Sequence, residues 1–160
     1  MDFCEGDMVV APGCGVGHIE EIAGVNLGDE PIQMYKIKLD TTDVRMWVPT
    51  HRAAIDGIRR PIEKNAIPEI LQTIEETKAP VKRANWNRRQ RRYRELLMSN
   101  DPLQIAALLG ELASVRAVKS LSFGERQMFE RARDLLAAEL QTTCEQSDDI
   151  VGRLEKALTT

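Results

Sequence analysis

The pattern of hydrophobic and polar positions changes at about residue 61. Before that point, four short apolar or alternating runs are separated by glycine, proline and acidic turn residues. In the clearest run, Tyr35, Ile37 and Leu39 alternate with lysines, and alternation with a period of two predicts a strand that buries one face. We therefore expect strands at 8–11, 16–22, 34–39 and 44–48. Four short strands joined by tight turns predict a small, strongly bent sheet or barrel.

After residue 61, turn residues become rare and apolar positions recur with helical spacing. Residues that can accept hydrogen bonds from the free amides of a first turn precede these segments, which is typical of helix starts. The expected starts are Asn65, Asn85, Asp101, Ser122 and about Ser147. Gln104 and Glu125 follow two of them by three residues, where they can complete capping boxes. The pattern therefore predicts about five helices packed as a bundle.

Together the two patterns predict an α+β protein with a small β domain at residues 1–60 and an all-α helical bundle at residues 61–160. The 160-residue chain is 42% hydrophobic and 29% charged, which is typical of a soluble globular protein. No apolar run approaches the roughly 20 residues that a membrane helix needs. The acidic N-terminus lacks an apolar signal core, so we expect no export.

Neither a metal site nor a cofactor is expected. Cys4, Cys14 and Cys144 are odd in number and lack Cys-x-x-Cys spacing, and only His18 and His51 accompany them. Reduced thiols in a cytoplasmic protein are the simplest interpretation of this pattern.

Three glycines, Gly13, Gly15 and Gly17, superficially suggest a phosphate-binding loop. Such a loop needs backbone amides that open a helix, whereas the segment that follows has the pattern of a strand and no Gly-Lys-Ser/Thr is present. We interpret the glycines as turn and bulge positions with positive φ.

No arrangement typical of an enzyme is found. The two histidines lie in or next to turns, without a serine or cysteine to activate. The acidic pairs Glu75–Glu76 and Asp148–Asp149 are adjacent on helices, and neighbours on a helix point about 100° apart, so neither pair converges on a substrate. The sequence therefore indicates a binding protein.

The segment from Lys82 to Arg94 is the clearest candidate for binding. It holds seven of the chain's 22 basic residues and no acidic residue, so that the other 147 residues sum to a charge of −10. It also contains Trp86 and Tyr93. Basic residues around aromatic rings suit a phosphate backbone beside stacked bases. The alternatives are a solvated arginine face, an acidic protein partner or a membrane surface.

A helix that starts at Trp86 divides these residues between two faces. Trp86, Gln90, Tyr93 and Leu97 fall on one stripe, whereas Arg88, Arg91, Arg92 and Arg94 spread over the opposite side and Arg89 lies at the flank. Trp86 can either project from the helix end or pack in the core with Tyr93 and Leu97.

The last expected strand has a second candidate surface. If Val44, Met46 and Val48 face the core, Arg45 and Trp47 point outward on a strand that can be an edge. Exposed tryptophan and arginine are frequent in protein interfaces, and a sheet edge can accept a partner strand. The alternative is that the second domain covers Trp47.

Three motifs, spread over nearly the whole chain, belong together by their order and spacing. They are Gly6-Asp7-Met8-Val9-Val10-Ala11-Pro12 with Gly15-Val16-Gly17, then Asn85-Trp86-Asn87-Arg88-Arg89, and last Leu121-Ser122-Phe123-Gly124-Glu125-Arg126, continued to Leu136. Together they resemble the CarD/CdnL family of bacterial transcription regulators. The first is similar to the family's opening strand and turn, the second to its Trp-x-Arg-Arg signature and the third to its late capped helix.

The resemblance implies a Tudor-like N-terminal domain that binds the β subunit of bacterial RNA polymerase, partly by strand pairing. By position, the strand is Val44, Arg45, Met46, Trp47, Val48 and Pro49. Some relatives have an arginine where Trp47 stands, so Arg45 or an apolar contact of Trp47 takes that role here.

The resemblance also implies a helical domain that rests on promoter DNA at the upstream edge of the melted region, without base-specific recognition. Trp86 matches the family tryptophan that wedges into the minor groove. The expected phosphate contacts are Arg88, Arg89, Arg91 and Arg92, with Arg83, Lys82 and Arg126 in addition. The regulator would stabilise the open complex in the cytoplasm, associated with the nucleoid through polymerase. The rivals are a stand-alone architectural DNA-binding protein and a protein–protein adaptor.

Overall fold

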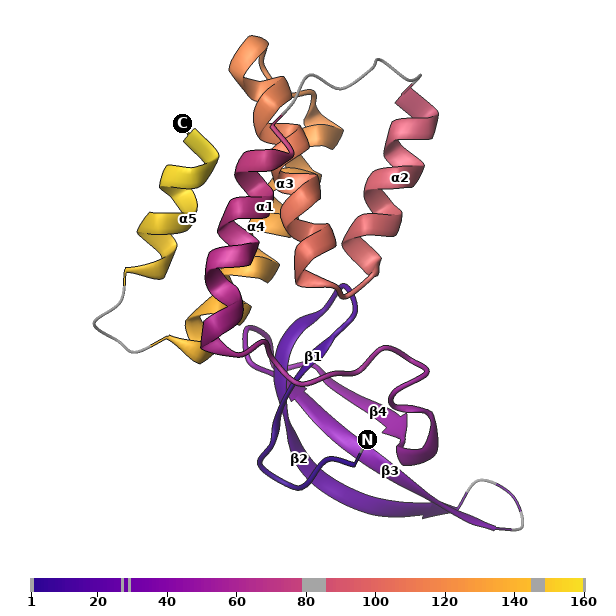
Figure 1. Cartoon of the computed structure of the whole chain (residues 1–160). Helices are drawn as coiled ribbons and strands as arrows, with labels where there is room; N and C mark the ends of the chain where they lie inside the picture. Colours follow the sequence, from indigo (N-terminus) through magenta and orange to yellow (C-terminus); the bar gives the residue numbers. More distant parts are fainter. Residues whose placement is uncertain (1, 27, 29, 79–85, 145–148, 160) are drawn as a thin grey trace. The chain divides into compact units, whose positions relative to one another are not determined.

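The computed structural model describes residues 2–26, 28, 30–78, 86–144 and 149–159, with the backbone alone at Trp86. It divides into two compact units, Met1–Pro61 and Ile62–Thr160 (Figure 1). The expected domain boundary, between residues 60 and 61, lies one residue earlier in the chain.

The first unit is a four-stranded antiparallel sheet that curls into half of a barrel, as in Tudor-like domains (Figure 1). Its strands, β1 (Met8–Ala11), β2 (Gly15–Asn26), β3 (Pro31–Leu39) and β4 (Arg45–Pro49), lie in chain order. A 3₁₀ turn at Thr50–Arg52 follows. The four expected strands are confirmed, but β2 continues beyond its expected end, because Gly24, Val25 and Asn26 pair with β3.

The expected alternation in β3 is confirmed, since Tyr35, Ile37 and Leu39 are all buried in the core of this unit. The expectation for β4 holds only in part. Val48 is buried and Met46 packs against the core, but Val44 is 54% exposed and precedes the strand. Val44 lies where the hairpin turn ends: its amide donates a hydrogen bond to Thr42 Oγ1 at 3.3 Å, and its carbonyl accepts one from the Leu39 amide at 3.1 Å.

The glycines before and within β2 have two different roles. Gly13 and Gly15 have φ angles of 69° and 95°, as expected for turn positions. The positive φ expected at Gly17 is wrong, because this residue lies within the strand, where a Cβ would lie 2.6 Å from the backbone oxygen of Lys38. The requirement at Gly17 is therefore the close approach of β2 and β3.

The end of the first unit is tied to its sheet. Arg59 forms an antiparallel bridge with Val10. The Arg60 guanidinium lies 3.3 Å from Asp7 Oδ2 and 5.2 Å from the Phe3 ring centroid. In the second unit, the Ile62 amide donates a 2.9 Å hydrogen bond to Glu139, which is 2% exposed.

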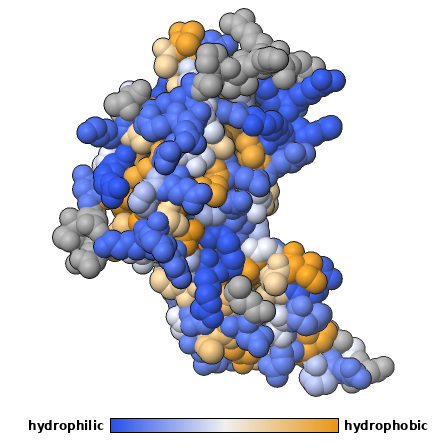
Figure 2. Space-filling model, viewed as in Figure 1, coloured by the Kyte–Doolittle hydropathy of each residue, from blue (hydrophilic) through white to orange (hydrophobic). Residues whose placement is uncertain are grey.

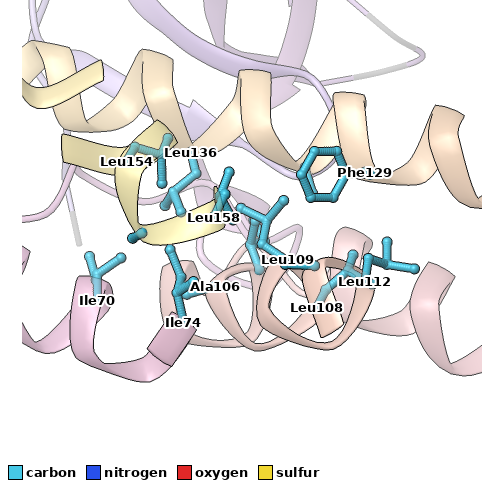
Figure 3. Close-up of a cluster of buried hydrophobic side chains, with 14 of the residues drawn as sticks. Ile70, Ile74, Ala106, Leu108, Leu109, Leu112, Phe129, Leu136, Leu154 and Leu158 are labelled. Carbon is cyan, nitrogen blue, oxygen red and sulfur yellow. The ribbon is translucent and has the colours of Figure 1, made fainter. Parts of the chain in front are cut away.

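Where the structure describes it, the second unit is a bundle of five α-helices, which confirms the expected all-α fold. A 3₁₀ turn at Lys64–Ala66 leads into α1 (Ile67–Glu76), followed by α2 (Trp86–Met98), α3 (Pro102–Val118), α4 (Phe123–Thr143) and α5 (Ile150–Thr159). Apolar side chains from each of these helices form one core. Figure 3 shows the part of this core that α1, α3, α4 and α5 contribute. Each fully buried leucine or isoleucine in it stabilises the fold by roughly 1.5–3 kcal/mol.

The helix starts follow the predicted capping chemistry in part. Ser122 and Glu125 form the expected capping box at α4, and Asp101 accepts a hydrogen bond from the Leu103 amide at 2.9 Å. Gln104 does not complete a box, because the Asp101 amide donates to Ser99 Oγ. Asn65 is not a cap, since it lies inside the 3₁₀ turn and Ala66 precedes α1. The expected starts at Asn85 and Ser147 lie outside the described residues.

Three whole-molecule properties bear on function. None of the described helices combines the length and apolar character that crossing a membrane requires. Where the chain is described, no three histidine, cysteine, aspartate or glutamate side chains gather as metal ligands. The three cysteines are free thiols.

Candidate nucleic-acid and partner interfaces

Helix α2 has one face toward the bundle and one basic face outward. Tyr93 is fully buried, and Gln90 and Leu97 are partly buried, so these members of the expected inner stripe are confirmed. Arg91 and Arg94 are exposed. Figure 2 shows hydrophilic side chains projecting from the region of α2. This outward face is the surface that phosphates can approach.

Trp86 is the first residue of α2. Its side chain lies outside the described residues, as do Lys82 and Arg83. The choice between a projecting and a packed tryptophan therefore stays a prediction.

Arg92 is held by a carboxylate from the neighbouring helix. Its two terminal nitrogens donate hydrogen bonds to the two carboxylate oxygens of Glu111 on α3. The Glu111 side chain is 11% exposed and that of Arg92 is 52% exposed. The hydrogen bonds to Glu111 raise the pKa of Arg92, which keeps the guanidinium charged.

Arg89 faces a second buried carboxylate, on α4. Its Nη1 lies 3.7 Å from Glu125 Oε2, and the Glu125 side chain is 4% exposed. The other oxygen of Glu125 accepts a 3.1 Å hydrogen bond from the Ser122 amide in the capping box. Glu125 thus caps its own helix and faces α2 at the same time.

The predicted phosphate contacts fall into two structural classes. Arg89 and Arg92 are ion-paired with buried carboxylates, although the Arg92 side chain is itself 52% exposed. Arg91 and Arg126 are exposed, and so is Arg88. A buried carboxylate that loses its cation is strongly destabilising. Arg91 and Arg126 can therefore turn to a phosphate at lower cost than Arg89 and Arg92.

Two exposed residues of the helical unit were not among the predicted site residues. Arg94 lies on α2, and Phe123, the first residue of α4, is 74% exposed. The exposure of Phe123 could have been predicted from the helical period of α4. Its buried positions begin at Glu125, about 200° further around the helix.

The candidate partner surface in the first unit is an edge strand. β4 pairs with β3 on one side and ends the strand order of the sheet. Arg45 and Trp47 are exposed on it, Trp47 at 45%. Lys36 lies directly opposite Trp47 on β3, with its Nζ 5.6 Å from the ring centroid. The outward orientation expected for Arg45 and Trp47 is thus observed.

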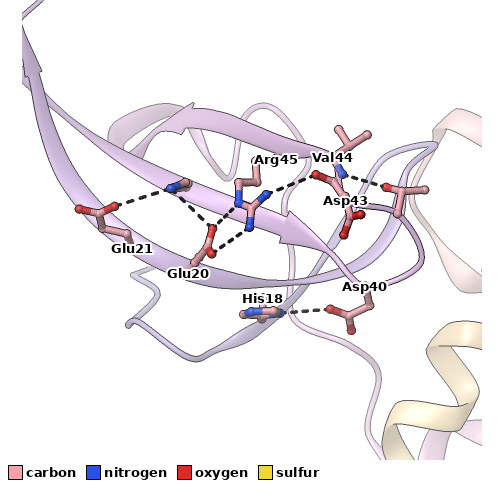
Figure 4. A network of polar contacts seen from close by, with 9 residues as sticks. His18, Glu20, Glu21, Asp40, Asp43, Val44 and Arg45 are labelled. Atoms are coloured by element: carbon pink, nitrogen blue, oxygen red, sulfur yellow. Dashed lines mark hydrogen bonds and ion pairs between the residues drawn. The ribbon is translucent and has the colours of Figure 1, made fainter.

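A β-bulge in β2 places two glutamates beside the cationic side chains of β3 and β4, and together they form a network of ion pairs (Figure 4). The register of β2 shifts between Ile19 and Glu21, so the extra residue Glu20 and its neighbour Glu21 are both exposed. Arg45 donates to both Glu20 oxygens, with Nε to Oε2 at 2.9 Å. Lys36 Nζ lies 3.7 Å from Glu20 and 3.9 Å from Glu21. The hydrogen bond from Arg45 lowers the pKa of Glu20, which keeps it ionised.

Comparison with known proteins identifies the family. The family model described as the CarD C-terminal domain matches residues 69–154, which include α2, α3 and α4. The chain belongs to the CarD/CdnL family. A curated relative from Bacillus subtilis (strain 168), named "Putative transcription factor YdeB", is 23% identical over 139 residues. That alignment covers 87% of this chain and 90% of the relative, so it extends beyond the helical unit into the β unit. Both findings point to transcription regulation rather than to catalysis.

Proposed function

We propose that this CarD/CdnL-family regulator binds the β subunit of bacterial RNA polymerase through β4 and stabilises the promoter open complex through its helical unit. The observation that carries the proposal is the pairing of two features on one chain. One unit has an edge strand with exposed Arg45 and Trp47, and the other has an arginine-rich helix that starts at Trp86. The first suits a protein partner and the second suits a polyanion.

The polymerase contact would use the open edge of β4. An edge strand offers unpaired backbone amides and carbonyls to which a partner strand can add. Arg45 and Trp47 would contribute side-chain contacts, with Val44 at the exposed start of the segment. The other residues of the proposed segment are Met46, Val48 and Pro49, of which Val48 is buried and holds the strand to its own core.

The DNA contact would be electrostatic and independent of sequence. Arg88, Arg91 and Arg126 are exposed and would meet phosphates directly, and Lys82 and Arg83 precede the helix in the chain. Arg89 and Arg92 would add positive potential from their paired positions. With a net charge of −3, the protein would bind free DNA weakly, so attachment to polymerase supplies the effective concentration.

Trp86 would act as a wedge at the edge of the melted region. It stands at the amino end of α2, where backbone amides also favour phosphate. An apolar ring in the minor groove unstacks a base step at a cost of a few kcal/mol. A step already distorted at a bubble edge costs less, so the wedge favours open over closed DNA. A twofold to tenfold effect needs only about 0.4–1.4 kcal/mol of differential binding.

The lifetime of a competitor-challenged open complex on a ribosomal RNA promoter tests the proposal. We expect cognate holoenzyme to form a complex that lasts about twofold to tenfold longer with the protein, and we expect Trp86→Ala to remove most of the gain. Trp47→Ala is the matched control for docking, because it should weaken binding to polymerase, whereas Trp86→Ala should not. An unchanged lifetime with the intact protein, once its binding to polymerase is established, would rule out the open-complex role.

A further inference from the structure

Over the described side chains, residues 87–98, the arginine-rich helix α2 has little apolar contact with the bundle on which it depends. Among residues 87–98, Tyr93 is the one hydrophobic side chain that is fully buried, and Leu96 and Leu97 are partly buried. By contrast, α3 buries eight residues. Because helical stability in proteins comes mainly from packing of an apolar face, α2 needs another source of attachment.

Two buried glutamates supply it, one from each neighbouring helix. Glu111 of α3 is buried and binds both terminal nitrogens of Arg92, and Glu125 of α4 is buried and faces Arg89. Tyr93 directly follows Arg92 in the sequence, and burial together with the Glu111 charge raises its pKa. The inner side of α2 therefore carries two ion pairs around one buried ring.

The two members of the Arg92–Glu111 pair differ in how well water can solvate their charges when the pair is broken. Arg92 is half exposed, so water can solvate its charge if Glu111 is neutral. Glu111 is nearly buried, so its charge has no comparable solvation if Arg92 leaves. The same asymmetry applies to Glu125, at 4% exposed, and Arg89, at 23% exposed. The carboxylates thus hold the arginines in place.

We propose that Glu111 and Glu125 are positioning residues that fix the orientation of α2 and keep Arg92 and Arg89 within the protein. Direct phosphate contacts from α2 then come from exposed arginines such as Arg91 and Arg94. No described side chain forms a hydrogen bond or ion pair with Arg91 or Arg94. This inference rests on the proposed function for its effect on promoter DNA, but the orientation of α2 can be tested without DNA.

Hydrogen exchange of the full-length protein tests the positioning directly. In Glu111→Gln and Glu125→Gln, the amides of α2 should exchange roughly tenfold faster, because the ion pairs that attach α2 to its neighbours are lost, while the core amides of α3 should stay protected. Glutamine can still complete a capping box, so Glu125→Gln retains the cap of α4. The matched control is Glu95→Gln on the exposed face of α2, which should leave exchange unchanged.

A double-mutant cycle keeps the test valid if a single variant is badly destabilised. Arg92→Gln should speed exchange of α2 more than Glu111→Gln, because it leaves a buried charge unpaired. The double variant should exchange more slowly than Arg92→Gln alone. If the effects of the two substitutions simply add, the pairing argument is overturned.

The open-complex lifetime then separates positioning from contact. Glu111→Gln and Glu125→Gln should shorten the lifetime together with faster exchange of α2. The double variant Arg91→Gln, Arg94→Gln should also shorten the lifetime, but with wild-type exchange of α2 and with a lifetime that depends less on salt.

If the glutamate variants keep wild-type exchange and lifetime while Trp86→Ala shortens the lifetime, positioning is refuted and the proposed function stands. If exchange changes as expected but no variant, Trp86→Ala included, affects the lifetime, the proposed function fails and the attachment of α2 by the glutamates stands.

Discussion

Among the described side chains of α2, Tyr93 is the one apolar side chain that is fully buried. It is the largest of the fully buried side chains in the described structure, and its hydroxyl is buried there without a hydrogen-bond partner. A buried hydroxyl that makes no hydrogen bond contributes a desolvation cost without a compensating gain. The ring therefore stabilises the unit and the oxygen does not.

We expect Tyr93→Phe to leave the free energy of unfolding unchanged or to raise it by up to about 1 kcal/mol, because it removes the unpaired hydroxyl. Tyr93→Ala should cost roughly 3–5 kcal/mol by opening a cavity in the core. Urea unfolding of both variants provides the comparison. A loss of more than about 1 kcal/mol in Tyr93→Phe would show that the hydroxyl has a partner in solution.

Gly17 offers a second test at the scale of single atoms. An added Cβ would lie 2.6 Å from the Lys38 oxygen and 3.1 Å from Ile37 Cγ2, so Gly17→Ala should destabilise the protein by about 1–3 kcal/mol. Gly24 lies in the same strand, where the nearest atom to an added Cβ would be 3.8 Å away. Gly24→Ala is thus the control, and thermal unfolding should show almost no change.

At the scale of elements, the β2 bulge links β2 to the candidate partner strand. Glu20 pairs with Arg45 on β4 and with Lys36 on β3, and Lys36 also lies over Trp47. Exposed pairs such as these contribute little to stability. Their effect is to restrict the side chains that a partner would meet, which lowers the entropy cost of binding.

The titration of Glu20 tests this network. Its pKa is lowered in the folded protein, so the pairing is present above the pKa of the unfolded chain and is lost as the pH falls through the folded value. In Arg45→Gln, the pKa of Glu20 should rise toward its ordinary value, because the hydrogen bond from Arg45 is the main cause of the shift. Carboxyl NMR titration of both proteins measures it. An equal pKa in the two would mean that the pair does not form in solution.

The capping box of α4 is a second element-scale device. Ser122 Oγ accepts a hydrogen bond from the Glu125 amide at 3.2 Å. Ser122→Ala should therefore cost about 0.5–2 kcal/mol in the free energy of unfolding. Ser120→Ala, two residues earlier and also exposed, is the control for loss of a hydroxyl. Equal stability of the two variants would contradict a role for the cap.

Period and capping chemistry alone predicted most elements of the whole molecule, because both act over a few residues. Interactions between elements could not be predicted from the sequence in the same way, because they depend on which elements pack together. The pattern of α2 placed Arg91 and Arg92 on the same side, but only the tertiary structure shows that Glu111 engages Arg92 while Arg91 is exposed. Likewise, Glu111 and Glu125 look like surface residues by type, and their burial depends on which helix packs against them. The bulge at Glu20 depends in the same way on the register of β2 with β3.

The junction between the two units has a consequence for protease digestion. Arg59 and Arg60 form contacts within the first unit, and Ile62 forms a hydrogen bond within the second. Pro61 alone lies between these two sets of contacts. A protease needs a stretch of chain that can leave the surface and extend into its active site. Trypsin cleaves after arginine, but the Arg60–Pro61 bond resists it because proline follows, and the Arg59–Arg60 bond lies in chain that is bound to the sheet. Isolated domains for separate study therefore have to be expressed from truncated genes, because limited digestion of the folded protein should leave residues 59–62 intact.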